Sequence, residues 1–413
     1  MSEFDFAVIG GGAAGFFGAI AFGEAHPGSR IVIIEKTNAV LGKVKISGGG
    51  RCNVTHACCE PKAFTKHYPR GEKSLIGPFH RWGAAETIDW FAEKGVELKT
   101  EGDGRMFPTT DQSTTIIECL LDAATAAGVE IYYRCDVDTL FAREDGWRVC
   151  FLEGADITAK AVLLASGGVR NGAGARLTEH LGHGVIPAAP SLFTFKIRDP
   201  RLMDLSGVSA PAVKASIPEL SLETQGPCLI THWGLSGPAV LKLSALGARA
   251  LADRDYRFDV SINWLNLSRE EVEASLQGER EASPKKRVRS GVRSIELPNR
   301  LWAQLVDFAE ISNETTWSNL SKKDRLDLVE QLVASKFTVD GKSMNKEEFV
   351  TAGGINLREV NFKTMESKLV PRLYFAGEVL DIDGLTGGFN FQAAWTTGRI
   401  AGESAAAAIY DPC

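Results

Sequence analysis

Residues 6–35 read FAVIGGGAAGFFGAIAFGEAHPGSRIVIIE, and the fold class can be inferred from them. An apolar run from Phe6 to Ile9 precedes a glycine-rich turn and a segment of helical character from Ala13 to Gly23. A second apolar run, from Arg30 to Glu35, is rich in Ile and Val. The order of apolar run, glycine turn, helix and apolar run predicts a β-α-β unit whose two strands are parallel.

The turn at residues 10–15 reads GGGAAG and matches the pattern G-x-G-x-x-G. Gly10 permits the tight turn, Gly12 lets the backbone approach a pyrophosphate, and Gly15 allows the helix to pack closely on the strand. The N-terminus of the helix offers backbone N–H groups to the phosphates. The acidic residue expected about 20 residues further on is Glu35, whose carboxylate can accept hydrogen bonds from ribose hydroxyls. These features together predict a dinucleotide site.

Three later segments favour FAD over NAD as the dinucleotide. Residues 375–378, FAGE, end a strand and place the Glu378 carboxylate where it can bind the ribityl hydroxyls of a flavin. Residues 386–390, TGGFN, lead into an Ala-rich helix whose N-terminal dipole can stabilise negative charge on a reduced flavin ring. Residues 165–168, ASGG, end another strand with backbone that can approach the cofactor closely. The NAD site of a dehydrogenase would not account for these three segments together.

Residues 47–53 read SGGGRCN, and three consecutive glycines beside an arginine suggest backbone that passes close to a ligand. Arg51 could hold the pyrophosphate or place positive charge near the ring, and Asn53 could hydrogen-bond a ring edge. The alternative is a structural turn with an exposed arginine. Cys52 is interpreted as a small packed residue, because a flavin disulfide reductase needs a second cysteine spaced to pair with it.

Residues 231–238, THWGLSGP, combine a titratable imidazole with two hydroxyls and a Gly-Pro pair that suits the start of a helix. His232 could donate or accept a proton near neutral pH. A histidine with a structural role in a turn is the alternative.

The composition excludes several partners. The net charge of −6 argues against chain-wide attraction to nucleic acid or to anionic lipid. The basic run between Arg280 and Arg293 is the local exception: it could contact a phosphate backbone, or it could be a solvated surface. Apolar runs fall far short of the roughly 20 residues that span a bilayer. The sequence shows neither a signal peptide nor a cysteine spacing typical of zinc ligands. We therefore expect a cytoplasmic protein that has no metal site and does not contact a membrane. A nucleic-acid partner is not expected either.

The pattern changes twice along the chain. Residues 130–165 form short alternating runs, the first at 131–133, that predict an antiparallel meander returning into the parallel sheet. Residues 189–262 stay β-rich, whereas 267–335 become charged and helical in character. The run at 373–376 then returns to the pattern of a buried strand. An inserted domain of two parts is therefore expected.

The chain resembles the flavoproteins of the HI0933-like family, also called the BaiN family of NAD(P)/FAD-dependent oxidoreductases. The resemblance covers nearly the whole length and rests on several ordered segments: GGGAAG at 10–15, GKVKISGGGRCNVT at 42–55, GRMFP at 104–108, ASGG at 165–168, THWGLSGPAVL at 231–241, TAGGINLREV at 351–360 and the long run from 364 to 402. Two residues depart from the family pattern: His56 stands where Asn is usual, and Arg372 where a small residue is common. Neither disturbs cofactor binding, and both leave the substrate preference open.

The fold class implied is α/β. A Rossmann-like FAD-binding domain, with a central parallel sheet and a β-meander, comprises residues 1–188 and 349–413. It is interrupted by a β-rich, barrel-like domain at 189–266 and 336–348, which carries a small helical subdomain at 267–335.

The predicted site residues follow from these motifs and from the resemblance. Arg51 and His232 are the candidate catalytic residues. The predicted cofactor contacts are Gly10, Gly12, Ala13, Ala14, Gly15, Glu35, Lys36, Lys43, Arg51, Cys52, Asn53, Val137, Ala165, Ser166, Gly167, Gly377, Glu378, Gly388, Phe389 and Asn390.

The expected activity is hydride transfer between FAD and a small organic substrate. No second G-x-G-x-x-G follows another strand, so NADH or NADPH, if it is the donor, is expected to dock only transiently. The resemblance implies either reduction of a conjugated ketone or oxidation of a small amine or amino-ketone by an oxygen-using oxidase. The alternative from another class is a flavin-dependent RNA-associated or binding protein, suggested by the basic run near residues 285–293.

Overall fold

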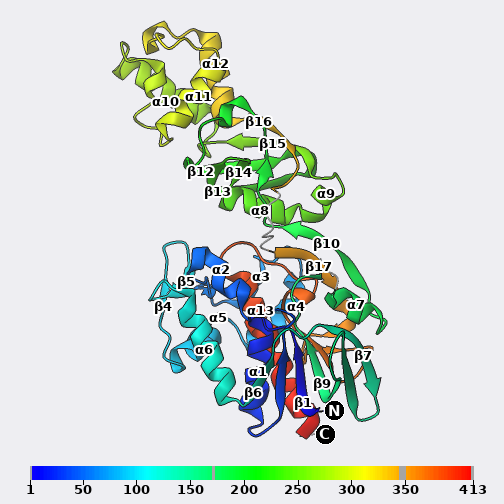
Figure 1. The fold of residues 1–413 in the computed structure, drawn as a ribbon. Helices are drawn as coiled ribbons and strands as arrows, with labels where there is room; N and C mark the ends of the chain where they lie inside the picture. The colour runs from blue at the N-terminus through cyan, green and yellow to red at the C-terminus, as the bar shows by residue number, and fades with distance from the viewer. Residues whose placement is uncertain (1, 170–172, 344–349, 411–413) are drawn as a thin grey trace. The chain divides into compact units, whose positions relative to one another are not determined.

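The computed structural model describes residues 2–169, 173–343 and 350–410. The chain divides into two compact units, residues 1–189 together with 350–413, and residues 190–349. Both ends of the chain therefore belong to the first unit (Figure 1).

Five parallel strands form the centre of the first unit. They are, in spatial order, β20 (Leu373–Phe375), β9 (Ile157–Leu164), β1 (Ser2–Ile9), β2 (Ile31–Ile34) and β6 (Val129–Tyr132). Side chains of β2 and β20 are buried throughout, as expected for strands covered on both faces. The predicted β-α-β unit is confirmed. Strands β1 and β2 pair in parallel, and α1 (Ala13–Ala25) lies between them in the sequence.

The predicted meander is confirmed in part. β7 (Val137–Arg143) and β8 (Gly146–Phe151) pair with each other, and β8 pairs antiparallel with β9. The prediction for residues 131–133 is wrong, because they lie at the end of β6 and beyond it, and β6 pairs in parallel with β2. Apolar and polar residues follow a similar pattern in a partly exposed outer strand and in a meander strand. The sequence pattern alone therefore does not distinguish the two kinds of strand.

The remaining elements of the first unit surround this sheet. β18 (Val360–Asn361) and β19 (Glu366–Ser367) extend it beyond β20. β3 (Thr55–His56), β5 (Arg105–Pro108) and β4 (Leu98–Thr100) form a small sheet, and β10 (Val185–Ser191) pairs with β17 (Val350–Ile355). The helices are α2 (Gly42–Gly50), α3 (Pro61–Thr65), α4 (Glu72–Arg81), α5 (Ala84–Glu93), α6 (Ser113–Ala126), α7 (Ala173–Glu179), η6 (Leu357–Glu359), η7 (Gly377–Val379) and α13 (Phe389–Tyr410).

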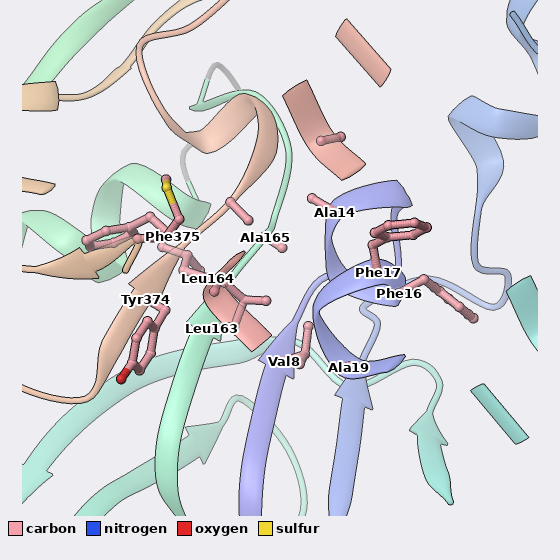
Figure 2. Close-up of a cluster of buried hydrophobic side chains, with 14 of the residues drawn as sticks. Val8, Ala14, Phe16, Phe17, Ala19, Leu163, Leu164, Ala165, Tyr374 and Phe375 are labelled. Atoms are coloured by element: carbon pink, nitrogen blue, oxygen red, sulfur yellow. The ribbon is translucent and has the colours of Figure 1, made fainter. Parts of the chain in front are cut away.

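The helices nearest the two ends of the chain pack directly on each other, and glycines make this possible. A Cβ on Gly398 of α13 would lie 2.4 Å from the carbonyl oxygen of Ala14 in α1, and one on Gly402 would lie 2.1 Å from the carbonyl oxygen of Gly18. Figure 2 shows α1 over the sheet, with Ala14 and Phe17 on the helix and Val8, Leu163 and Leu164 on the strands. The backbones of α1 and α13 are therefore in contact.

The second unit contains a nearly closed antiparallel sheet. Its strands, in spatial order, are β11 (Phe195–Lys196), β14 (Gly234–Ser236), β13 (Leu222–Thr231), β12 (Ser209–Ile217), β15 (Arg257–Asn263) and β16 (Ser335–Asp340). The backbone N–H of Lys196 donates to Gly341 O at 3.0 Å, just past the end of β16. This contact brings the first and last strands together and confirms the expected barrel-like sheet.

Helices complete the second unit. They are η2 (Pro200–Leu202), η3 (Pro218–Leu220), α8 (Pro238–Leu246), α9 (Ala248–Ala252), α10 (Arg269–Ala282), η4 (Val288–Ser290), α11 (Asn299–Phe308), η5 (Trp317–Asn319) and α12 (Lys322–Val333). Buried residues of α10, α11 and α12 belong to the same apolar cluster as the residues of the sheet. The split of this unit into a β-rich part and a helical part at 267–335 stays a prediction.

Substitution of Gly402 by alanine tests the contact between α1 and α13. The added methyl group has no room beside Gly18, so we expect the free energy of unfolding to fall by about 1–3 kcal/mol. Gly278→Ala is the control, since Gly278 lies in helix α10 with no atom near its Cβ position, and it should raise stability by up to about 1 kcal/mol. Urea unfolding of both variants measures the difference. Equal stability of Gly402→Ala and the parent protein would contradict the close packing.

Candidate cofactor site

The turn between β1 and α1 has the shape that its glycines predict. Gly10 has a φ of +111°, and a Cβ there would lie 2.4 Å from Ala165 O. A Cβ on Gly15 would lie 2.0 Å from Gly10 O. Around Gly12, by contrast, nothing lies within 4 Å of the Cβ position. The first and third glycines are thus required by the protein's own packing, and the second faces open space.

The Glu35 carboxylate closes this turn from the end of β2. Its Oε2 accepts a hydrogen bond from Gly11 N at 3.0 Å, and its Oε1 accepts one from Thr37 N at 2.9 Å. Each carboxylate oxygen can accept a further bond, so the group can also receive ribose hydroxyls. Glu35 therefore holds the glycine turn in place through Gly11. Its predicted role, acceptance of hydrogen bonds from ribose hydroxyls, stays a prediction.

The carboxyl ends of three parallel strands bring together segments that are distant in sequence. Ala165 N donates to Ile9 O at 2.9 Å at the ends of β9 and β1, and Ala376 N donates to Leu164 O at 3.1 Å at the ends of β20 and β9. Gly167 has a φ of +77° and open space at its Cβ position. The predicted contacts Gly10, Ala165, Ser166, Gly167 and Gly377 consequently lie at one edge of the sheet, where ligands of open α/β sheets bind.

Two predicted cofactor residues pair with each other. Lys43, in the first turn of α2, contacts Glu378 with an Nζ to Oε2 distance of 2.5 Å. The other carboxylate oxygen of Glu378 accepts a hydrogen bond from Thr351 N at 3.2 Å. The pair joins α2 to the chain after β20, so residues from both ends of the sequence meet here as well.

The SGGGRCN segment forms the end of α2 and the turn after it. Its three glycines, residues 48–50, have φ values of +57°, +70° and +85°, and Gly49 and Gly50 have open space at their Cβ positions. Cys52 is buried, also has a positive φ, +62°, and burial raises the pKa of its thiol to about 12. Such a thiol stays protonated, which fits the interpretation of Cys52 as a packed residue.

Arg51 is held by acidic and aromatic neighbours of its own unit. Its Nη1 lies 2.6 Å from an oxygen of Glu101 and 3.5 Å from one of Asp111, and its guanidinium lies 3.9 Å from the ring centre of Phe107. The hydrogen bond with Glu101 raises the pKa of Arg51 above its usual value. These contacts fix the guanidinium, and its role toward a ligand stays a prediction.

Asn53 and Asn390 shape the loop before α13. In the amide orientation that suits its neighbours, Asn53 accepts from Gly388 N at 2.9 Å and donates to Met106 O at 3.2 Å. Asn390 accepts from Gly384 N and donates to Gly384 O, both at 2.8 Å. A Cβ on Gly388 would lie 2.5 Å from Thr55 O. The two asparagines thus support the glycine loop in the structure, while their contacts with a flavin stay predictions.

The remaining predicted residues differ in their surroundings. Ala14 and Phe389 are buried, and a Cβ on Gly377 would lie 2.9 Å from the Cβ of Ala14. Val137 is buried at the start of β7, whereas Lys36 is exposed after β2. Ala13 is half-buried at the first position of α1.

His232 lies in the second unit, in the turn between β13 and β14, and its side chain is exposed beside the exposed Trp233. The Gly-Pro pair that follows begins α8, as predicted, with Pro238 at the first helical position. His232 is not part of the arrangement in the first unit described above, and its catalytic role stays a prediction.

Two buried polar groups near this edge escape the motif analysis. Arg70 donates two hydrogen bonds to the fully buried carboxylate of Asp383, which lies in the loop before α13. Gln392, also fully buried, hydrogen-bonds residues of three different segments. A polar Gln392 between Phe391 and the apolar run Ala393–Trp395 is the signal in the sequence that could have pointed to the second group.

The arrangement fits a dinucleotide. Backbone N–H groups at the start of α1 have no partner within the helix, and the space in front of Gly12 is open. Glu35 follows directly after β2, and Glu378 follows shortly after β20, so each carboxylate lies beyond the carboxyl end of a strand. Among the described residues, no group of His, Cys, Asp or Glu could hold a metal ion, and no helix is long and apolar enough to cross a membrane.

Comparison with known proteins gives consistent matches. The family model described as HI0933-like protein Rossmann domain matches residues 4–404. The chain is 31% identical to the "Ribosomal RNA dihydrouridine synthase" of Escherichia coli K12, over 96% of each chain. It is 28% identical to the "3-dehydro-bile acid delta(4,6)-reductase" of Clostridium scindens, over 97% of this chain and 98% of that protein.

Solved structures share the fold. The 3-ketosteroid-delta4-(5alpha)-dehydrogenase of Rhodococcus jostii RHA1 matches with a TM-score of 0.52, covering 98% of this chain and 97% of the other, at 16% identity. At this identity the likeness concerns the architecture alone.

Substitution of Gly12 by valine separates the binding role of the loop from its structural role. The new side chain enters open space at an ordinary φ of −95°, so the protein without cofactor should keep its stability within about 0.5 kcal/mol. The side chain would occupy the place of the pyrophosphate, so FAD affinity should fall by more than about tenfold, or about 1.4 kcal/mol. Fluorescence titration with FAD measures the affinity. Unchanged FAD affinity in a folded Gly12→Val variant would show that the loop is not the phosphate site.

Proposed function

Since this chain belongs to the HI0933-like family of FAD-dependent oxidoreductases, we propose that it reduces a carbon–carbon double bond conjugated to a carbonyl group. The observation that carries the cofactor part is the carboxyl edge of the parallel sheet, where segments from both ends of the chain meet. Next to it, Gly12, Gly49, Gly50 and Gly167 have open space at their Cβ positions. The choice of reaction rests on the two relatives, whose names describe different substrates.

Both names describe one kind of chemistry. Formation of a dihydrouridine saturates a carbon–carbon double bond of the uracil ring that is conjugated to a ring carbonyl. A delta(4,6)-reductase acting on a 3-oxo compound saturates a double bond conjugated to that ketone. Where such a double bond is adjacent to the carbonyl group, reduction adds a hydride to the carbon β to the carbonyl and a proton to the α carbon. This shared reaction is the function that we propose for the chain.

In this scheme we assign roles to residues at the carboxyl edge of the sheet. The chemistry that bound FAD would supply is hydride transfer from its reduced form. The first-turn amides of α1 would hold the pyrophosphate, and Glu35 would accept the ribose hydroxyls. Glu378, oriented by Lys43 and by Thr351 N, would accept the ribityl hydroxyls. The N-terminus of α13 would favour negative charge on the reduced ring, and the ion pairs of Arg51 would keep its guanidinium fixed beside the glycine turn. NADH or NADPH is proposed as the transient donor.

Anaerobic mixing tests the reaction. Protein reduced with dithionite should be reoxidised by a 3-oxo compound with a conjugated double bond, giving the saturated ketone, and the same ketone already saturated is the control substrate. Stopped-flow reduction by NADH and by NADPH in parallel identifies the donor. Reoxidation by oxygen alone, together with reduction of the flavin by small amines or amino-ketones, would contradict the proposal and identify an oxidase.

The uridine of an RNA is the second candidate substrate, because the relative from Escherichia coli is named for ribosomal RNA. The basic run offers a contact for such a substrate, although several of its charges are paired within the second unit. Lys286 contacts Glu279, which is buried, at 2.9 Å, and Arg287 contacts the exposed Glu314 at 2.7 Å. Lys285 is exposed. Charge reversal is therefore best made at Lys285 and Arg287, which leaves Glu279 paired.

The double variant Lys285→Glu/Arg287→Glu distinguishes the two substrates. If RNA is the substrate, retention of transcribed ribosomal RNA should fall and its salt dependence should weaken, because about two phosphate contacts are lost. Lys322→Glu/Lys323→Glu, an equal charge change at exposed positions of α12, is the control. Reduction of the small ketone should be the same in all three proteins. RNA retention that is absent in the parent protein, or equal in all three, would contradict a role of the basic run.

A further inference from the structure

We infer that Gln392 is a positioning residue that fixes the N-terminus of α13 relative to the segment 52–56, and that it thereby sets how strongly the protein stabilises the reduced flavin. The inference rests on the proposed function only in that it requires bound FAD. It concerns the potential of the bound flavin and holds for either proposed substrate.

Gln392 joins three segments through its side chain. The amide oxygen accepts a hydrogen bond from Thr55 Oγ1 at 2.6 Å, and the amide nitrogen donates to Gly83 O at 3.0 Å and to Thr87 Oγ1 at 2.8 Å. The nitrogen also lies 3.0 Å from Thr396 Oγ1, one turn along α13. All of these side chains are fully buried. A buried amide with every partner fixed in place holds a single orientation.

Two further contacts fasten the same segment to α13. Trp395 Nε1 donates to Val54 O at 3.0 Å, and Asn53 accepts from Gly388 N. Gly388 itself approaches Thr55 so closely that no side chain would fit. Together with the bond from Thr55 to Gln392, these contacts join the first turn of α13 to the segment 52–56 as one rigid piece.

The orientation of the first turn matters because its charge is uncompensated within the helix. The first N–H groups of an α-helix have no intrahelical acceptors and carry partial positive charge, which acts only over the first turn. No acidic residue lies in the first turn of α13. A small displacement of this turn would therefore weaken the stabilisation of negative charge in front of it. Gln392 lies in this turn but points into the buried network, so it acts through position.

Two substitutions in this hydrogen-bond network separate a positioning role of Gln392 from a role in packing alone. Thr55 can be changed to valine, which keeps the volume and removes only the hydrogen bond to Gln392. Gln392→Leu removes all bonds of the amide and takes the acceptor away from the Thr55 hydroxyl. Gly83 O keeps the hydrogen bond from Thr87, and the Thr396 hydroxyl keeps its bond to Trp82 O. The two changes should displace the first turn to different degrees and in the same direction.

The experiment compares purified holoenzymes of the parent, Gln392→Leu, Thr55→Val and Ser29→Ala. Ser29 is a buried residue of the same unit that bonds His26 O and the hydroxyl of Tyr410, before β2 and away from the carboxyl edge of the sheet, and serves as the control for loss of a buried hydroxyl. FAD content, melting temperature, the affinity for sulfite and the two-electron potential of the flavin are measured. Sulfite forms an adduct with negative charge on the flavin ring, so its affinity reports the same stabilisation as the potential.

Gln392→Leu should keep its FAD and lose at least about tenfold in sulfite affinity, and its potential should fall by about 30 mV, which is a tenfold change for a two-electron couple. Thr55→Val should shift both quantities in the same direction by less, and Ser29→Ala should change neither. If Gln392→Leu and Thr55→Val melt at lower temperature but keep the parent's potential and sulfite affinity, the residue is only structural and the inference is wrong. If Gln392→Leu does not fold, Thr55→Val decides by the same criterion. Failure of the proposed function is distinguishable, because the potential and sulfite affinity are read from bound flavin whether or not any enone is reduced.

Discussion

Close contact between the backbones of α1 and α13 joins the two ends of the sequence within the first unit. Gly18, Gly398 and Gly402 allow two backbones to touch, so that the first and last helices of the unit lie side by side over the same sheet. α1 begins at the dinucleotide turn, and α13 begins at the glycine loop of residues 384–388. Close helix packing therefore places two helix N-termini, from opposite ends of the sequence, against one edge of the sheet.

This arrangement explains why the site consists mainly of backbone. Gly10, Gly15 and Gly388 admit a neighbouring backbone, and Gly12, Gly49, Gly50 and Gly167 have open space at their Cβ positions. Several side chains around these loops support them. Glu35 holds Gly11, Asn53 holds Gly388, and Asn390 holds Gly384. The ionisable groups are likewise paired, as with Lys43 and Glu378 or Arg51 and Glu101. A preorganised site of this kind suits a cofactor that brings its own chemistry.

Local patterns predicted a large part of the fold. The β-α-β unit was predictable because glycine spacing, helix periodicity and buried strands all lie within thirty residues of chain. The pairing of β6 with β2 was not predictable, because a partly exposed outer strand has a residue pattern similar to that of a meander strand. Within the candidate site, the glycine-rich loops and the acidic residues that follow the strands, Glu35 and Glu378, were predictable because each is recognised from a short stretch of sequence. The acids around Arg51 and the partners of Gln392 are distant in sequence, and only the folded structure brings them together.

If both ends of the chain bind FAD together, the purified protein contains flavin, and its flavin content can be measured. We expect a yellow protein whose denaturation releases one FAD per chain, or a colourless protein that takes up one FAD per chain on reconstitution. Protein that stays colourless after reconstitution, or that releases FMN in place of FAD, would show that the two ends of the chain do not form an FAD site.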